Sequence, residues 1–151
     1  MRLLTLTAVL LSLLPPLAWG GALTTTLYRE VTVPDAAQLH GIYAGLRHCQ
    51  PRQMLPRPVF KPQGLPFHGD VPALEDGVRY ALRHPVSMGQ RLLLTEVSRQ
   101  DSHYQLRFNK SLRVYASQLP QDLQAVMADA GLTGIAVSAD GRQLTCRPAG
   151  R

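Results

Sequence analysis

The sequence predicts an α+β domain, in which a mainly antiparallel sheet carries about three helices and one disulfide. Some stretches alternate apolar and polar residues, as strands do, and others repeat apolar residues every three to four positions, as helices do. Two cysteines lie in a chain that begins like an exported protein. We expect the elements in the order β-α-loop-α-β-β-α-β-β.

The N-terminus has the order of features found in secretory signal peptides. Arg2 precedes an apolar run over residues 3–14, two prolines end this run, and small residues surround a cleavage point after Gly20. We expect residues 1–20 to be removed, or the cleavage to fall at residue 22 instead. The remainder, 21–151, is long enough for a single domain.

The apolar run is too short for a membrane span, which needs about 20 residues. No later stretch is long and apolar enough either, so the mature protein is expected to be soluble. The 16 basic residues comprise 14 arginines and 2 lysines, a bias typical of GC-rich bacterial genomes. These observations predict a periplasmic or secreted bacterial protein with a net charge of +5, because the removed segment contains one charge, Arg2, of the +6 total.

The two cysteines are expected to form a disulfide, Cys49–Cys146, because paired thiols tend to bridge in an oxidising compartment. Such a bridge would close a loop of about 100 residues, worth about 4–5 kcal/mol in the chain-entropy treatment. An alternative is a copper site made by His48, Cys49 and Met54, which would leave Cys146 as a lone thiol. His84 and Met88 resemble part of a second soft copper-binding set.

The first mature segment predicts a strand followed by a helix. Residues 24–33 alternate in polarity and contain β-branched residues, so we expect a strand there. Asp35 and Gln38 have the spacing of a capping box, and the apolar residues that follow have helical spacing. We therefore expect a helix over 36–48 that ends beside Cys49.

A basic, proline-rich connector is expected over residues 51–72, where six of 22 residues are proline. Because proline interrupts helices and central strands, we expect an ordered loop without regular structure. A second helix is expected over 70–84, with Asp70 as N-cap and His84-Pro85 at its end.

The remaining chain predicts two hairpins around a third helix. The first hairpin pairs 91–98 with 103–109, and its second strand is expected to continue through 112–116. The third helix follows Ser117 and ends at Gly131. A final hairpin, 133–137 with 142–146, turns at Asp140-Gly141.

Residues 41–48 and 77–84 resemble each other, since both end in Leu-Arg-His. A duplicated helical unit would explain the likeness. The flanking segments differ, however, which favours coincidence in a chain rich in arginine and leucine.

No local motif for phosphate binding, nucleophilic catalysis, zinc or thiol redox chemistry occurs in the sequence, and no cofactor is indicated. The histidines have no ligand spacing, so a catalytic site would require distant residues to meet in space. The five histidines are His40, His48, His68, His84 and His103. A non-enzymatic binding or adaptor protein is therefore the leading hypothesis, and a small envelope enzyme with dispersed histidine and acidic residues is the alternative.

The basic connector and the helix expected after it form the candidate surface for a partner. Arginine pairs with carboxylates and phosphates in two-point geometry, and a partly extended connector loses little entropy on docking. We expect the partner to be another envelope protein or an anionic envelope component. Sparse aromatic residues disfavour nucleic acid. The candidate residues are Arg52, Arg57, Lys61, Arg79 and Arg83.

Overall fold

The computed structural model describes residues 30–114, 116–129 and 134–149. The expected signal peptide, most of the expected first strand and Gly131 lie outside these residues. The described elements are, in chain order, α2 (Ala36–Arg47), α3 (Pro51–Met54), α4 (Arg57–Phe60), β1 (Phe67–His68), β2 (Val71–Pro72), β3 (Arg79–Ser87), β4 (Leu93–Gln100), β5 (His103–Phe108), the 3-10 helix η1 (Ala116–Gln118), α5 (Gln121–Ala128), β6 (Ile135–Val137) and β7 (Gln143–Cys146).

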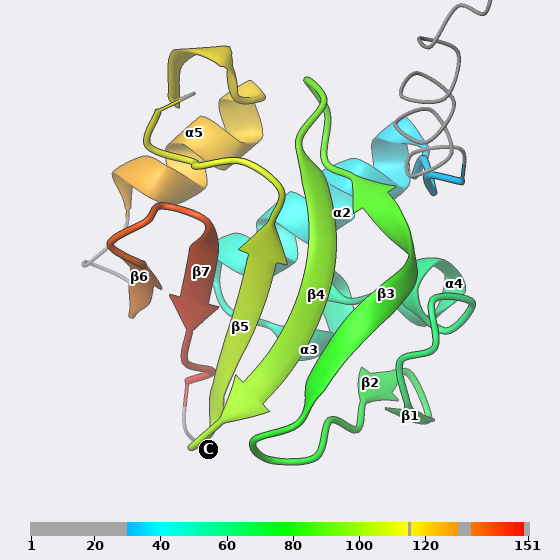
Figure 1. Cartoon of the computed structure of the whole chain (residues 1–151). Coiled ribbons are helices and arrows are strands. Elements are labelled where there is room, and N and C mark those ends of the chain that lie inside the picture. The colour runs from blue at the N-terminus through cyan, green and yellow to red at the C-terminus, as the bar shows by residue number, and fades with distance from the viewer. Residues whose placement is uncertain (1–29, 115, 130–133, 150–151) are drawn as a thin grey trace, which may run out of the picture.

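The predicted α+β class is confirmed. Five antiparallel strands form the main sheet in the order β3-β4-β5-β7-β6, and β1 and β2 form a separate small hairpin. The helices α2 and α3 pass behind the main sheet in Figure 1, and α5 packs on α2. In this view no described element lies in front of β3, β4 and β5, so the described part of the chain leaves one side of the sheet uncovered, which we call its solvent side.

Alternating burial distinguishes the two sides of the sheet. Along β5, Tyr104, Leu106 and Phe108 are buried in the core, and the residues between them are partly exposed. Leu106 lies opposite Leu144 of β7, which is also fully buried. Within the described residues, no helix is long and apolar enough to cross a bilayer.

The first helix begins as its sequence predicts. The Asp35 side chain accepts a hydrogen bond from the Gln38 backbone at 2.8 Å, and the Gln38 side chain accepts one from the Asp35 backbone at 3.0 Å. This reciprocal pair satisfies two amide groups that a helix N-terminus would leave without partners. The helix ends at Arg47, one residue earlier than expected.

The expectation that the connector lacks regular structure was wrong. Residues 51–72 contain the two four-residue helices α3 and α4 and the β1–β2 hairpin. Within these two helices, proline occupies only the first turn, as Pro51 in α3 and Pro58 in α4. Because the first turn of a helix does not use its amide hydrogens internally, proline is tolerated there.

The expected second helix over 70–84 was also wrong, since most of its residues form a turn, an irregular segment and the edge strand β3. Gly77 has a φ of +75°, which no helix residue adopts. Pairing with β4 makes residues 79–87 a strand, in which Tyr80 lies opposite the fully buried Val97. Pro85 is acceptable in an edge strand, where its carbonyl accepts a hydrogen bond from Thr32.

The two C-terminal hairpins are confirmed. Strands β4 and β5 meet at Asp101 and Ser102, both with positive φ, as a tight two-residue turn requires. Strand β5 ends at Phe108 and does not continue as expected, because residues 112–114 form a turn and Leu112 is buried. The part of the expected first strand that is described makes one parallel bridge, Thr32 to Val86.

The likeness between residues 41–48 and 77–84 is not a repeated structural unit. The first segment lies largely in α2, and the second leads into β3. The Leu-Arg-His sequence therefore adopts two different conformations in one chain.

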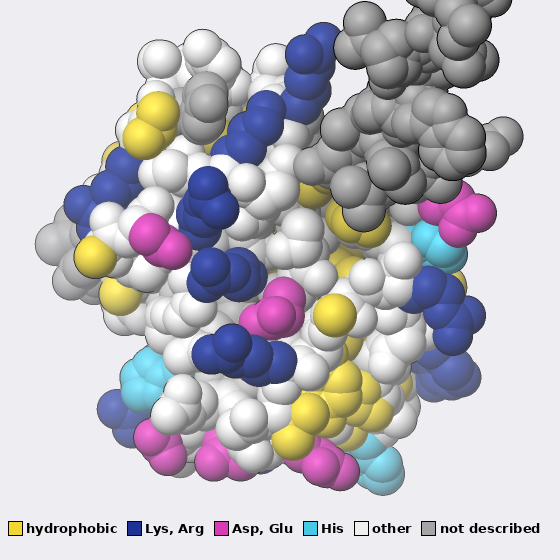
Figure 2. All heavy atoms as spheres, in the orientation of Figure 1, with side chains coloured by type: hydrophobic (Ala, Val, Ile, Leu, Met, Phe, Trp, Pro, Cys, Tyr) yellow, Lys and Arg dark blue, Asp and Glu magenta, His cyan; other side chains and the backbone are white. Residues whose placement is uncertain are grey.

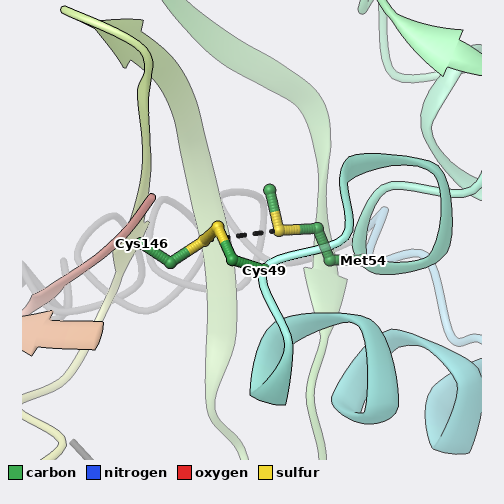
Figure 3. The surroundings of a disulfide bond; sticks show 3 residues. All are labelled: Cys49, Met54 and Cys146. Carbon is green, nitrogen blue, oxygen red and sulfur yellow. Dashed lines mark hydrogen bonds between the residues drawn. A yellow bond between two sulfur atoms is a disulfide. The ribbon is translucent and has the colours of Figure 1, made fainter. Parts of the chain in front are cut away.

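The Cys49–Cys146 disulfide is confirmed, and its Cα atoms lie 5.7 Å apart. It connects the residue after the α2 C-cap to the last residue of β7. Both cysteines are buried, and the Met54 side chain points at the bridge in Figure 3. The Met54 Sδ to Cys146 Sγ distance is 3.8 Å, a van der Waals contact because a bridged sulfur carries no hydrogen.

Candidate functional site

One buried side chain, Gln63, fastens the connector to the edge of the sheet. Its Nε2 donates to Thr32 Oγ1 at 2.6 Å, and its Oε1 accepts from the His84 backbone at 2.9 Å. The backbone carbonyl of Gln63 accepts a third hydrogen bond, from the Arg83 backbone amide, at 3.2 Å. Gln63 is 3% exposed, so these partners replace water around its amide. The connector is thereby held along β3.

Two of the five candidate residues bind the connector to itself. The Arg52 guanidinium lies 3.3 Å from the Asp70 carboxylate, and Arg57 donates to the Gly69 carbonyl at 3.0 Å. Both arginines therefore contact the turn between β1 and β2. Asp70, which was expected to cap a helix, instead forms an ion pair with Arg52.

The other three candidates form a surface that we name the basic edge: Lys61, Arg79 and Arg83. Arg79 and Arg83 lie four residues apart on β3, and Lys61 lies two residues before Gln63. Among the residues that the structure describes, Lys61 and Arg83 form no ion pair. Arg79 makes one long contact, 3.9 Å, with Glu96. The sequence interpretation placed Arg79 and Arg83 on a helix, whereas the structure places them on an edge strand.

A hollow with a volume of about 250 Å³ lies between α2 and α5. We name it the helix hollow. His40 pairs with Asp122 at 3.4 Å, and two turns further along both helices Arg47 pairs with Asp129 at 2.9 Å. The hollow lies beside these two contacts. The lining residues are His40, Tyr43, Ala44, Arg47, His48, Asp122, Ala125 and Val126.

The helix hollow brings together two histidines and an acid, as the enzyme alternative requires, but it is open to water. The side chains of His40 and Asp122 are 75% and 54% exposed, so solvent screens their charges. The Tyr43 hydroxyl donates to the Met88 carbonyl. Burial, assisted by the charge of Asp122, raises the pKa of Tyr43 far above its usual value. Tyr43 therefore keeps its proton and does not act as a base.

The copper site that includes Cys49 was wrong, because Cys49 is bonded to Cys146. The other candidate copper ligands make contacts at different places. Met54 packs on the disulfide, and His84 lies 3.0 Å from Glu30. Met88 is fully buried, and its carbonyl accepts the Tyr43 hydrogen bond. Within the described residues, no three His, Cys, Asp or Glu side chains are grouped to hold a metal ion.

Sequence reasoning missed the helix hollow and the bonding role of Gln63. His40 lies in α2 and His48 is its C-cap, but nothing in the sequence indicated that Asp122 of α5 would face them. The six prolines also concealed Gln63, since a loop without regular structure gave no reason to expect a buried amide there. The remaining histidines lie on separate strands, His68 on β1, His84 on β3 and His103 on β5.

Comparison of the chain with protein-family models, with curated proteins and with solved structures found no match.

Proposed function

We propose that this protein is a non-enzymatic binding or adaptor protein of the bacterial periplasm, or a secreted one. In this proposal the basic edge recognises a carboxylate-rich surface of another envelope protein. The structural disulfide suits an oxidising compartment, which supports the expected export.

The observation that carries this proposal is the attachment of the connector through Gln63. Because Gln63 bonds to Thr32, Arg83 and His84, Lys61 and Arg83 are presented from an ordered surface. A preordered surface loses less conformational entropy on binding than a flexible one. Lys61 and Arg83, which form no ion pair with any described residue, are available to carboxylates of a partner.

The proposal is tested by affinity capture from native bacterial envelope with the mature protein as bait. The double variant Lys61→Ser with Arg83→Ser should lose most captured partner, because both available charges of the basic edge are removed. Arg142→Ser with Arg147→Ser is the matched control, since both arginines are exposed and the charge loss is equal. Equal capture by the wild type and both variants would contradict the proposal.

The helix hollow supports a second candidate, a small envelope enzyme that uses His40, His48 and Asp122. Imidazole and carboxylate groups that face one hollow can transfer protons. A panel of ester, phosphoester and glycoside substrates would test it. Turnover by the wild type that is lost in His40→Ala and kept in His103→Ala would favour the enzyme over the adaptor.

A further inference from the structure

The solvent side of the main sheet carries a continuous row of charged side chains. Glu96 of β4 lies opposite Arg107 of β5, and Arg79 of β3 approaches Glu96 at 3.9 Å. Arg107 continues the row to Asp140 at 3.7 Å. Since Leu106 and Phe108 are buried in the core, Arg107 between them points to the solvent side.

Arg113 extends this row beyond the strands. Its guanidinium donates to the Val137 carbonyl at 3.1 Å, and its Cγ lies near Gly141. Arg113 therefore lies beside the β6–β7 turn, which also contains Asp140. The row thus crosses the sheet from one edge to the other.

Another hollow lies where β4 begins and β5 ends. It opens on the solvent side, because its lining residues Leu93 and Asn109 alternate with the core residues Leu94 and Phe108. Its volume is about 370 Å³ and it is lined by Arg91 and Lys110 together with Leu93, Asn109 and Val31. Two cations thus lie beside an apolar surface. A phosphate group bonded to an apolar chain would match both parts of this lining.

We name the cations of this side the basic face: Arg79, Arg91, Arg107, Lys110 and Arg113. They outnumber the two acids in the row, Glu96 and Asp140. Figure 2 shows Lys and Arg side chains spread across this side of the molecule, over the strands. Because none of the described helices covers this side of the sheet, these cations can approach one extended surface together.

Acidic side chains gather instead at one end of the sheet. The Asp101 backbone donates to Asp76 Oδ1 at 2.9 Å, which places the β4–β5 turn beside the segment before β3. Figure 2 shows acidic side chains along the lower margin of the molecule, at this end of the sheet. The charge is therefore distributed unevenly, and a negative surface would attract the basic face and repel the acidic end.

We propose that the basic face holds the protein against an anionic phospholipid bilayer. This proposal is independent of the basic edge and its protein partner. The surface of such a bilayer is broad and negatively charged, and the basic face is broad and positively charged, so the two surfaces are complementary. The strand residues on this side include no Phe, Trp or Tyr, so a stacking platform for nucleic acid is absent from the described strands.

Vesicle sedimentation tests the proposal with the mature, disulfide-bonded protein at low salt. Vesicles that contain phosphatidylglycerol should bind the protein, vesicles of pure phosphatidylcholine should not, and added salt should release it. Each Lys or Arg near an anionic surface strengthens binding by about fivefold. The triple variant Arg91→Ser, Arg107→Ser and Arg113→Ser should therefore lower the partition coefficient by about a hundredfold.

The matched control removes the same charge elsewhere: Arg47→Ser, Arg52→Ser and Lys61→Ser. These side chains lie on α2, α3 and the end of α4, away from the solvent side of the sheet, so a much smaller loss is expected. Circular dichroism verifies that both variants fold. Equal losses in the two variants would overturn the proposal, because net charge alone would explain them. Binding to a soluble polyanion such as heparin without vesicle binding would also overturn it.

Discussion

At the scale of single residues, Gly45 shows how closely the backbone segments approach around the disulfide. A Cβ atom at this position would lie 2.2 Å from the Met54 amide nitrogen, which is backbone and cannot rotate away. Met54 in turn contacts the disulfide. The absence of a side chain at residue 45 thus allows α3 to pack on α2 beside the Cys49–Cys146 bridge.

The substitution Gly45→Ala should lower the free energy of unfolding by about 1–3 kcal/mol, because the added methyl group forces backbone apart. Gly41→Ala is the matched control in the same helix, where nothing lies within 4 Å of the added atom. It should raise stability by about 0.5–1 kcal/mol, since alanine favours helix over glycine. Urea unfolding of both variants measures the difference. A Gly45→Ala variant as stable as Gly41→Ala would contradict this packing.

At the scale of elements, the sequence predicted local structure best where the interacting residues are near each other in the chain. The capping box of α2 and the hairpin of β4 and β5 depend on residues that are close in the chain, and both were predicted correctly. Residues 79–84 were predicted as helix because the apolar spacing fits one, but pairing with β4 makes them a strand. Such pairing depends on residues distant in sequence and outweighs local preference.

The candidate site shows the same division. The basic residues of the connector could be identified from composition. The cysteine count predicted the disulfide at Cys49, just before the connector. Gln63 could not be identified, because its three partners come from residues 31, 20 and 21 positions away. The helix hollow likewise depends on His40 meeting Asp122, 82 positions later.

Gln63→Ala should loosen the connector from β3 and lower the free energy of unfolding by about 1–3 kcal/mol, because the His84 amide loses its buried acceptor. Gln121→Ala, at an exposed position in α5, should change it by less than about 0.5 kcal/mol. Hydrogen exchange at the His84 amide should accelerate in Gln63→Ala alone. Unchanged exchange at His84 would contradict the bonding role of Gln63.

At the scale of the whole molecule, the disulfide joins the N-terminal and C-terminal parts of the described chain. Cys49 and Cys146 are 97 positions apart, so the bridge restricts most of the unfolded chain. Replacing both cysteines by alanine should lower the free energy of unfolding by about 4–5 kcal/mol. Urea titration measures this loss. The wild type should show the same loss in reductant, and the double variant should not respond to reductant.

The two proposed surfaces also belong to this scale, because they lie at different places on one fold. The basic edge includes β3 and the connector, whereas the basic face extends over the solvent side of the sheet to the β6–β7 turn. Arg79 is common to both, and the variants chosen above avoid it. Losses in partner capture and in vesicle binding are therefore separable.

The most direct measurement is the intact mass of the protein recovered from the bacterial periplasm, before and after reduction. The expected mass lacks residues 1–20, or the slightly longer segment that ends at residue 22, and reduction should add two hydrogen atoms. Retention of the N-terminal residues would contradict export with cleavage. An unchanged mass on reduction, with two thiols open to labelling after denaturation, would contradict the Cys49–Cys146 bridge.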